Sequence, residues 1–200
     1  MDQLYPIITR SRTLAEKLAL RMKFIVGLCN ICGKLTRFSV DGTNLRETVI
    51  CGNCRSTNRQ RQIGNVLTGF FSLVEQRKVK QLVNLERSRF LRIYNTEARG
   101  ALHEALKQMD GYYCSEYFGP ELKPGELIGD VPHQDLMNLS LPDDSVDVVL
   151  SSDVFEHIPF PYKAHSEVFR ILRSNGRHIF TVPFYQEEFL DEERASLSKD

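Results

Sequence analysis

The sequence predicts an α/β domain with a doubly wound parallel sheet, preceded by a small cysteine-rich module and its flanking helices. Three observations lead to this prediction. From residue 89 onward, short apolar stretches alternate with segments of helical periodicity. Four of the five cysteines fall into two Cys-x2-Cys pairs between residues 29 and 54. The net charge of zero divides into +11 for residues 1–92 and −11 for residues 93–200, which indicates two modules with different roles.

The composition fits one core of ordinary size with a small appendage: the chain has 200 residues, of which 42% are hydrophobic and 26% charged. No run of about eighteen apolar residues occurs, so we expect no membrane span. The first thirty residues mix charged and apolar side chains without an uninterrupted apolar segment and a small-residue cleavage site, which argues against a secretion signal. We therefore expect a cytoplasmic protein.

The first predicted element is an N-terminal helix within residues 1–27. Ser11 and Thr13 can cap its start, and the apolar residues that follow recur at helical spacing. These residues are Leu14, Leu18, Met22 and Ile25.

Residues 28–56 are predicted to form a zinc-ribbon-like module. Two Cys-x2-Cys turns can direct four thiolates at one point, which is the ligand set of a closed tetrahedral Zn²⁺ site. The four cysteines are Cys29, Cys32, Cys51 and Cys54. Two alternatives compete: disulfides, which would need an oxidising compartment, and a redox Cys-x-x-Cys, which normally occurs once beside a βαβ unit. Four thiolates leave no open position for a substrate, so we interpret the zinc as structural.

Between the two cysteine pairs we expect a β-hairpin. Leu35–Val40 and Arg46–Ile50 flank an Asp-Gly turn at residues 41–44. Gly33 and Gly52 lie where the cysteine loops need residues that tolerate a positive φ. A module of about thirty residues is too small to hold a core without its metal.

A connecting helix is predicted within residues 57–88. Its apolar face consists of Ile63, Val66, Leu67, Phe70, Phe71 and Val74. Arg55, Arg59 and Arg61 lie at the start of this helix. Such a cluster fits phosphate or nucleic-acid binding, but it also fits a solvated helix start, and the sequence leaves both readings open.

Residues 89–200 carry the predicted α/β domain. Its expected elements are a strand at Phe90–Tyr94, a helix with Ala101, Leu102, Ala105, Leu106 and Met109 on one face, strands at Gly111–Ser115 and Val146–Leu150, a helix with Ala164, Val168, Ile171 and Leu172 that ends at Asn175-Gly176, and a strand at His178–Val182. Repeated strand, helix, strand units indicate a parallel sheet with helices on both faces. Cys114 stands alone in one of these strands and is interpreted as a small buried apolar residue.

Acidic residues follow the predicted strands. The ligand site of a doubly wound sheet lies beyond the carboxyl ends of its strands. Carboxylates there suit hydroxyl and amine donors, such as a ribose and an exocyclic amino group, whereas they repel a triphosphate. The chain lacks the Gly-Lys-Ser/Thr of a phosphate-binding loop and the Gly-x-Ser-x-Gly of an α/β hydrolase, which disfavours both classes.

The segment LSLPDDSVDVVLSSDVFEHI at residues 139–158, followed by EVFRIL at 167–172, resembles class I S-adenosylmethionine-dependent methyltransferases of the type 11 group. A subgroup of these enzymes also carries an N-terminal element with two Cys-x2-Cys pairs, and the similarity extends over roughly residues 25–184. The resemblance implies a Rossmann-like domain with S-adenosylmethionine over the sheet. It implies that Glu97 and Gly100 face the methionine part of the cofactor, that Glu116 accepts hydrogen bonds from the ribose, and that Asp135 and Leu136 flank the adenine.

Three features depart from the family pattern. Asn95–Gly100 replaces the usual glycine-rich loop, and Arg173–Gly176 replaces the usual Pro-Gly-Gly. The family fold ends in an antiparallel strand pair, yet only seventeen residues follow Pro183. We therefore expect the C-terminal end to be either truncated or degenerate. We expect the open sheet edge to pair with a second subunit, or residues 184–197 to fold back as a helix.

His157 is the only histidine at a predicted strand end, where it could act as a general base. The alternative is that Glu156 and His157 fix the loop over the sheet. Asp147 lies inside a strand and is expected to pair structurally.

Two functional hypotheses follow. The first is S-adenosylmethionine-dependent methyl transfer to an unidentified acceptor, which we expect to be a small molecule or glycan-like and to enter near Asp153–Phe160. The second is a non-catalytic, zinc-containing protein that binds nucleic acid or protein through its basic N-terminal half on a degenerate methyltransferase scaffold. A homo-oligomer is compatible with both.

Overall fold

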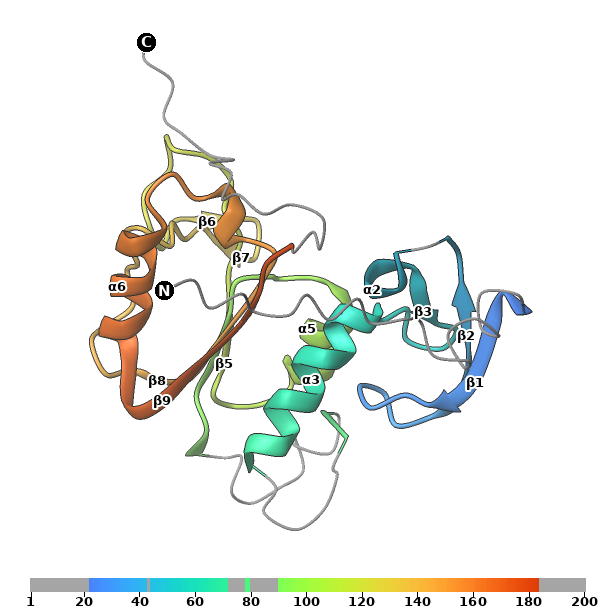
Figure 1. Cartoon of the computed structure of the whole chain (residues 1–200). Helices are drawn as coiled ribbons and strands as arrows, with labels where there is room; N and C mark the ends of the chain where they lie inside the picture. Colours follow the sequence, from blue (N-terminus) through green and yellow to red (C-terminus); the bar gives the residue numbers. More distant parts are fainter. Residues whose placement is uncertain (1–21, 43, 72–77, 80–89, 184–200) are drawn as a thin grey trace, which may run out of the picture.

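The computed structural model describes residues 22–42, 44–71, 78–79 and 90–183 (Figure 1). Across these residues the protein is a mixed α/β structure with a parallel main sheet, as the sequence predicts. Most of the predicted N-terminal helix, and the segment after Pro183, lie outside the described residues. Within the described ranges, no helix has the length and apolar character to cross a membrane.

The N-terminal part contains a three-stranded antiparallel sheet in the order β1-β2-β3. Its strands are β1 (Phe24–Leu28), β2 (Leu35–Val40) and β3 (Val49–Cys51). The helix prediction is therefore wrong for residues 24–27. Every residue of β1 pairs with β2, from Phe24 opposite Ser39 to Leu28 opposite Leu35, and this ladder outweighs the helical spacing that ended at Ile25.

A short helix, α2 (Leu45–Thr48), replaces the first part of the strand predicted at Arg46–Ile50, while Val49 and Ile50 lie in β3 as predicted. Asn44 caps it, because its side-chain oxygen accepts a hydrogen bond from the Arg46 amide at 3.2 Å and its carbonyl accepts one from the Thr48 amide at 2.9 Å. Pairing with β2 begins only at Val49. Local capping thus converts the expected tight hairpin into a strand, helix, strand unit.

Helix α3 (Asn58–Phe71) begins with a reciprocal capping box. Thr57 Oγ1 accepts a hydrogen bond from the Gln60 amide, and Gln60 Oε1 accepts one from the Thr57 amide, each at 3.3 Å. Ile63 and Leu67 are buried as predicted. Val66 is 52% exposed, so its assignment to the buried face is wrong. The buried face is centred on Ile63 and Leu67, and Val66 lies outside it. Val74 lies outside the described residues.

The main sheet has four parallel strands in the order β5-β4-β8-β9. They are β4 (Ile93–Asn95), β5 (Tyr112–Cys114), β8 (Val146–Ser152) and β9 (Leu172–Thr181). Helix α5 (Gly100–Leu106) connects β4 to β5, and the 3-10 turn η2 (Phe155–His157) with helix α6 (Pro161–Ile171) connects β8 to β9. A small hairpin of β6 (Leu127–Ile128) and β7 (Val131–Pro132) precedes β8. The chain order reverses between β4 and β8, which makes this the topological switch point of the sheet.

Two element boundaries differ from the predictions. Strand β4 begins at Ile93, and Phe90 is 83% exposed. The Asn175-Gly176 pair does not end α6 but lies within β9, where the register against β8 shifts. Asn175 has a φ of +64°, and a Cβ on Gly176 would meet the Asp147 carbonyl oxygen at 3.1 Å. The pair therefore forms an irregularity in a strand rather than a helix end.

Helices cover both faces of the sheet: α3 and α5 lie on one side and α6 on the other (Figure 1). On the first side, one buried cluster joins the three-stranded sheet, α3, α5 and the main sheet, through residues such as Phe38, Ile63, Leu102 and Val148. On the second side, α6 contributes Ala164, Val168 and Ile171 to a separate cluster with Val149. The N-terminal sheet is thus packed into the same core as one face of the main sheet.

Candidate functional site

Four cysteine thiols meet in the N-terminal part. The sulfur atoms of Cys29, Cys32, Cys51 and Cys54 all lie within 4.8 Å of one another, and those of Cys29 and Cys54 are 3.8 Å apart. A tetrahedral ion with Zn–S bonds of about 2.3 Å separates its sulfur ligands by about 3.8 Å. The donor set and its spacing therefore fit a zinc ion. We call β1, β2, α2, β3 and the loops from Cys29 to Ser56 the four-cysteine module.

Two similar turns hold the thiols in place. Gly33 N donates to the carbonyl of Cys29 at 2.8 Å, and Arg55 N donates to that of Cys51 at 3.0 Å. Gly33 has a φ of +75°, as predicted. Gly52 is not among the residues with positive φ; it is needed for another reason, because a Cβ there would lie 2.8 Å from the Arg37 carbonyl oxygen.

The thiols of Cys29 and Cys54 share a hydrogen bond, which lowers the pKa of the Cys29 thiol and raises that of Cys54. Arg61 is buried beside these sulfurs, where it donates to the carbonyl oxygens of Ser56 at 2.6 Å and Val49 at 2.9 Å. Arg61 is therefore a structural residue, and neither the solvated nor the phosphate-binding reading describes it.

The second candidate site lies at the carboxyl ends of β4, β5 and β8, beside the switch point. Glu97, in the loop after β4, lies 4.0 Å from Arg59, and burial raises the pKa of its carboxyl to about 6. The neighbouring Thr96 is 9% exposed, and its buried Oγ1 has no hydrogen-bond partner among the described residues. Gly100 opens α5 with a φ of +86°, and a Cβ there would lie 2.7 Å from Gln60 Nε2. The start of α3 thus covers the loop after β4.

Glu116 follows β5 and faces the same loop. Its Oε1 accepts hydrogen bonds from the Ala98 amide at 3.1 Å and from Arg99 Nε at 3.0 Å. Glu116 and Glu97 are close enough for the charge of Glu116 to raise the pKa of Glu97 further, after burial. The structure therefore brings together the two carboxylates to which the family resemblance gives neighbouring parts of one ligand.

Asp135 and Leu136 lie on the segment that runs beside the end of β5. Glu116 forms a parallel bridge with His133, and Gln134 N donates to the Glu116 carbonyl at 3.1 Å. Asp135 Oδ1 accepts from the Met137 amide at 2.8 Å, and Leu136 is buried. Burial, with a further contribution from the charge of Asp135, raises the pKa of Tyr117.

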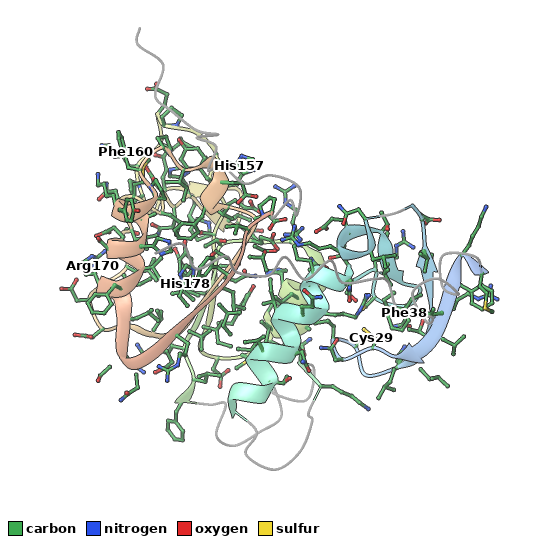
Figure 2. All side chains as sticks on the ribbon, viewed as in Figure 1. Cys29, Phe38, His157, Phe160, Arg170 and His178 are labelled. Atoms are coloured by element: carbon green, nitrogen blue, oxygen red, sulfur yellow. The ribbon has the colours of Figure 1, made fainter. Side chains whose placement is uncertain are left out.

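The loop after β8 carries three ionisable residues. Asp153 has a φ of +53° and accepts hydrogen bonds from Arg46 and Thr181. Burial alone would raise the pKa of Asp153, but these hydrogen bonds outweigh it and hold the pKa below its usual value. Glu156 Oε2 is buried and has no hydrogen-bond partner among the described residues. The His157 side chain is 77% exposed, with Nε2 3.9 Å from Glu156 Oε1. Figure 2 places His157 and Phe160 at the same end of the molecule, away from Arg170 at the other end of α6.

Two arginines contact Asp153 at this site, and the sequence predicted neither contact. Arg46 forms a bidentate pair with Asp153, 107 residues away, and Arg59 lies 3.4 Å from the same carboxylate. No local spacing relates residues so far apart, so only the fold reveals the contact. Asp147, in contrast, behaves as expected: it accepts from the Arg92 amide at 2.7 Å and pairs with Arg173 at 3.3 Å.

Comparison with known proteins supports a methyltransferase domain in the second half of the chain. Residues 99–180 match the family described as "Methyltransferase domain". The chain is 40% identical over 70 residues to an "Uncharacterized methyltransferase" of Mycobacterium avium (strain 104), a match that covers 30% of this chain and 28% of that protein. It is 35% identical over 83 residues to a protein of the same description from Mycobacterium ulcerans (strain Agy99), covering 33% and 32%. It is 43% identical over 54 residues to a "Probable S-adenosylmethionine-dependent methyltransferase" of Mycolicibacterium smegmatis, covering 27% and 21%. The matches thus span less than a third of the relatives' length.

Proposed function

We propose that this chain binds S-adenosylmethionine at the carboxyl ends of β4, β5 and β8 and takes part in methyl transfer. One observation carries the proposal: the segment that matches a methyltransferase domain, residues 99–180, contains the end of β5, the whole of β8 and the loops beyond them. Those are the positions where a doubly wound sheet binds its ligand.

The residues at these strand ends fit the cofactor. Thr96 Oγ1 and Glu156 Oε2 are buried without a protein partner among the described residues, and buried polar groups of this kind call for a ligand or water. The carboxylates of Glu97 and Glu116 are acceptors, which suits a ligand that offers an ammonium group, ribose hydroxyls and an amino group. The site therefore offers the acceptors that such a ligand needs.

We assign the roles as the resemblance implies. Glu97 and Gly100 would contact the methionine part, Glu116 would accept from the ribose, and Asp135 and Leu136 would flank the adenine. When bound, S-adenosylmethionine supplies an activated methyl group on its sulfonium. The contribution of the chain is to bind and orient this group and to exclude water from it.

His157 remains our candidate for the base that removes a proton from the acceptor. It lies in the turn directly after β8, and its ring is exposed, so an acceptor can reach it. We propose a small-molecule or glycan-like acceptor that enters between Asp153 and Phe160. The four thiols are proposed to hold a structural zinc ion.

The scaffold alternative receives less support. Arg59 and Arg61, two of the three arginines considered for phosphate or nucleic-acid contact, donate to groups inside the protein, whereas Arg55 is exposed. A basic cluster that is engaged internally offers little charge to an external phosphate.

Calorimetric titration with S-adenosylmethionine tests the proposal. We expect saturable binding by the zinc-loaded chain, and Glu116→Ala should weaken it by about 1–3 kcal/mol because ribose hydroxyls lose a charged acceptor. Glu121→Ala, which removes an exposed carboxylate from the loop after β5, serves as the matched control and should bind like the unmodified chain. Absence of binding by the unmodified chain, or equal affinities of the two variants, would overturn the proposal.

A further inference from the structure

Two arginines of the N-terminal half reach the carboxyl ends of the main sheet. Arg46, on α2, donates from Nη1 to Asp153 Oδ2 at 2.8 Å and from Nη2 to Oδ1, so it binds the carboxylate in a bidentate manner. Arg59, in the first turn of α3, donates from Nη1 to Ser152 Oγ and has its Nε 3.4 Å from Asp153 Oδ2. The same Nη1 lies 4.0 Å from Glu97 Oε1. The two side chains therefore connect the ends of β4 and β8.

These contacts are mostly shielded from water. The side chain of Arg59 is 16% exposed and that of Asp153 is 20% exposed. An Arg–carboxylate fork of this kind fixes orientation as well as charge. Asp153 also has a φ of +53°, a left-handed conformation that Asp adopts more readily than most residues with a Cβ.

The positions of both arginines depend on the four-cysteine module. Arg46 lies between β2 and β3, and β3 ends at Cys51. Arg59 follows Cys54 by five residues, in a helix whose start is fastened by the Thr57–Gln60 capping box. Arg61 ties the same helix to the Ser56 carbonyl of the second cysteine loop. We therefore expect a change in the cysteine loops to displace the arginines as well.

We propose that Arg46 and Arg59 are positioning residues of the strand-end site: they hold the Asp153 and Glu97 carboxylates in place, so that the site is complete only when the four-cysteine module is folded. This inference rests on the proposed function only for the identity of the ligand. It gives the module a role in the ligand site beyond that of a separate structural appendage.

Hydrogen exchange measured by mass spectrometry on the full zinc-loaded chain tests the positioning directly, without a ligand. In Arg46→Ala and Arg59→Ala we expect faster exchange in peptides that cover residues 95–100 and 151–157, while peptides around Cys29 and Cys32 keep their protection and the zinc content is unchanged. Arg37→Ala is the matched control, because the Arg37 guanidinium stacks on Phe24 within the three-stranded sheet, 3.8 Å from the ring centroid. It should leave both strand-end peptides as they are. Removal of the metal with a chelator should accelerate exchange in the cysteine peptides and in the strand-end peptides together.

Titration with S-adenosylhomocysteine adds the functional readout. We expect Arg59→Ala to lower the affinity about tenfold, equivalent to about 1.4 kcal/mol, and Arg37→Ala to leave it unchanged. Arg59→Lys keeps the charge but not the bidentate geometry, so its affinity should lie between those of Arg59→Ala and Arg37→Ala. It also provides a measurement if Arg59→Ala does not fold. If the strand-end peptides of Arg46→Ala and Arg59→Ala exchange at the same rate as those of the unmodified chain, the inference is wrong. If those peptides respond as expected but the unmodified chain binds no ligand, the proposed function fails and the positioning role stands.

Discussion

We expect substitution of Gly100 by alanine to destabilise the protein. Three effects combine in Gly100→Ala. A φ of +86° costs a residue with a Cβ about 1–2 kcal/mol. The smaller conformational freedom of alanine in the unfolded chain offsets about 0.4–1 kcal/mol of this. The new methyl group would lie 2.7 Å from Gln60 Nε2, so the Gln60 side chain must move and its half of the α3 capping box is lost, at a cost of about 0.5–1 kcal/mol. We expect a net destabilisation of about 1–2 kcal/mol.

Urea denaturation followed by far-ultraviolet circular dichroism measures this change, since the chain has no tryptophan for fluorescence. Gly100→Ala combined with Gln60→Ala should be less destabilised than the sum of the single variants, because the steric conflict is gone while the backbone strain remains. Gly69→Ala is the control: it lies inside α3 with open space around its Cβ position and should stabilise by about 0.5–1 kcal/mol. A neutral Gly100→Ala, or strict additivity with Gln60→Ala, would show that the backbone strain and the contact with Gln60 do not have these effects.

Three further predictions concern the metal site, the Arg170 side chain on α6 and the pH dependence of stability. Cys51→Ser should abolish zinc binding measured by native mass spectrometry, whereas Cys114→Ser should retain it; equal loss in both would contradict the four-thiol assignment. Arg170→Lys should lower the free energy of unfolding by about 1–2 kcal/mol in urea, because the lysine cannot reproduce the donation to the Leu139 and Leu141 carbonyls, and an unchanged midpoint would contradict it. Burial raises the folded-state pKa of Glu97 from 4.5 to about 6, so the stability it contributes is complete below about pH 4.5 and is lost as the pH rises through 6. The free energy of unfolding of Glu97→Gln should therefore exceed that of the unmodified chain by on the order of 1–2 kcal/mol at about pH 8 and equal it at about pH 4. A difference that does not depend on pH would show that the charge of Glu97 is not its cause.

The sequence predicted features that depend on local patterns. Continuous apolar runs such as Val146–Leu150 and the alternation with helical segments predicted the parallel sheet, and the cysteine spacing predicted the meeting of four thiols. Both signals arise from residues that are neighbours in the chain or repeat at fixed intervals.

Other features depend on competition between local and distant contacts. Ile25 has helical spacing with the residues before it, but pairing with β2 stabilises a strand at this position instead. Asn44 can sit in a turn or cap a helix, and here it caps α2. The contact of Arg46 with Asp153 joins residues that only the packing of two modules brings together. The assignment of Glu97, Glu116 and Asp135 to parts of a cofactor remains a prediction.

We propose that a ligand of the S-adenosylmethionine type binds over the carboxyl ends of β4, β5 and β8. A crystal structure of the zinc-loaded chain with S-adenosylhomocysteine would locate it. We predict the ribose within hydrogen-bond distance of Glu116, the amino-acid end beside Glu97 and Thr96, and the adenine beside Asp135 and Leu136. A ligand bound elsewhere on the molecule, or strand ends that stay free of ligand at saturating concentration, would rule out this binding site.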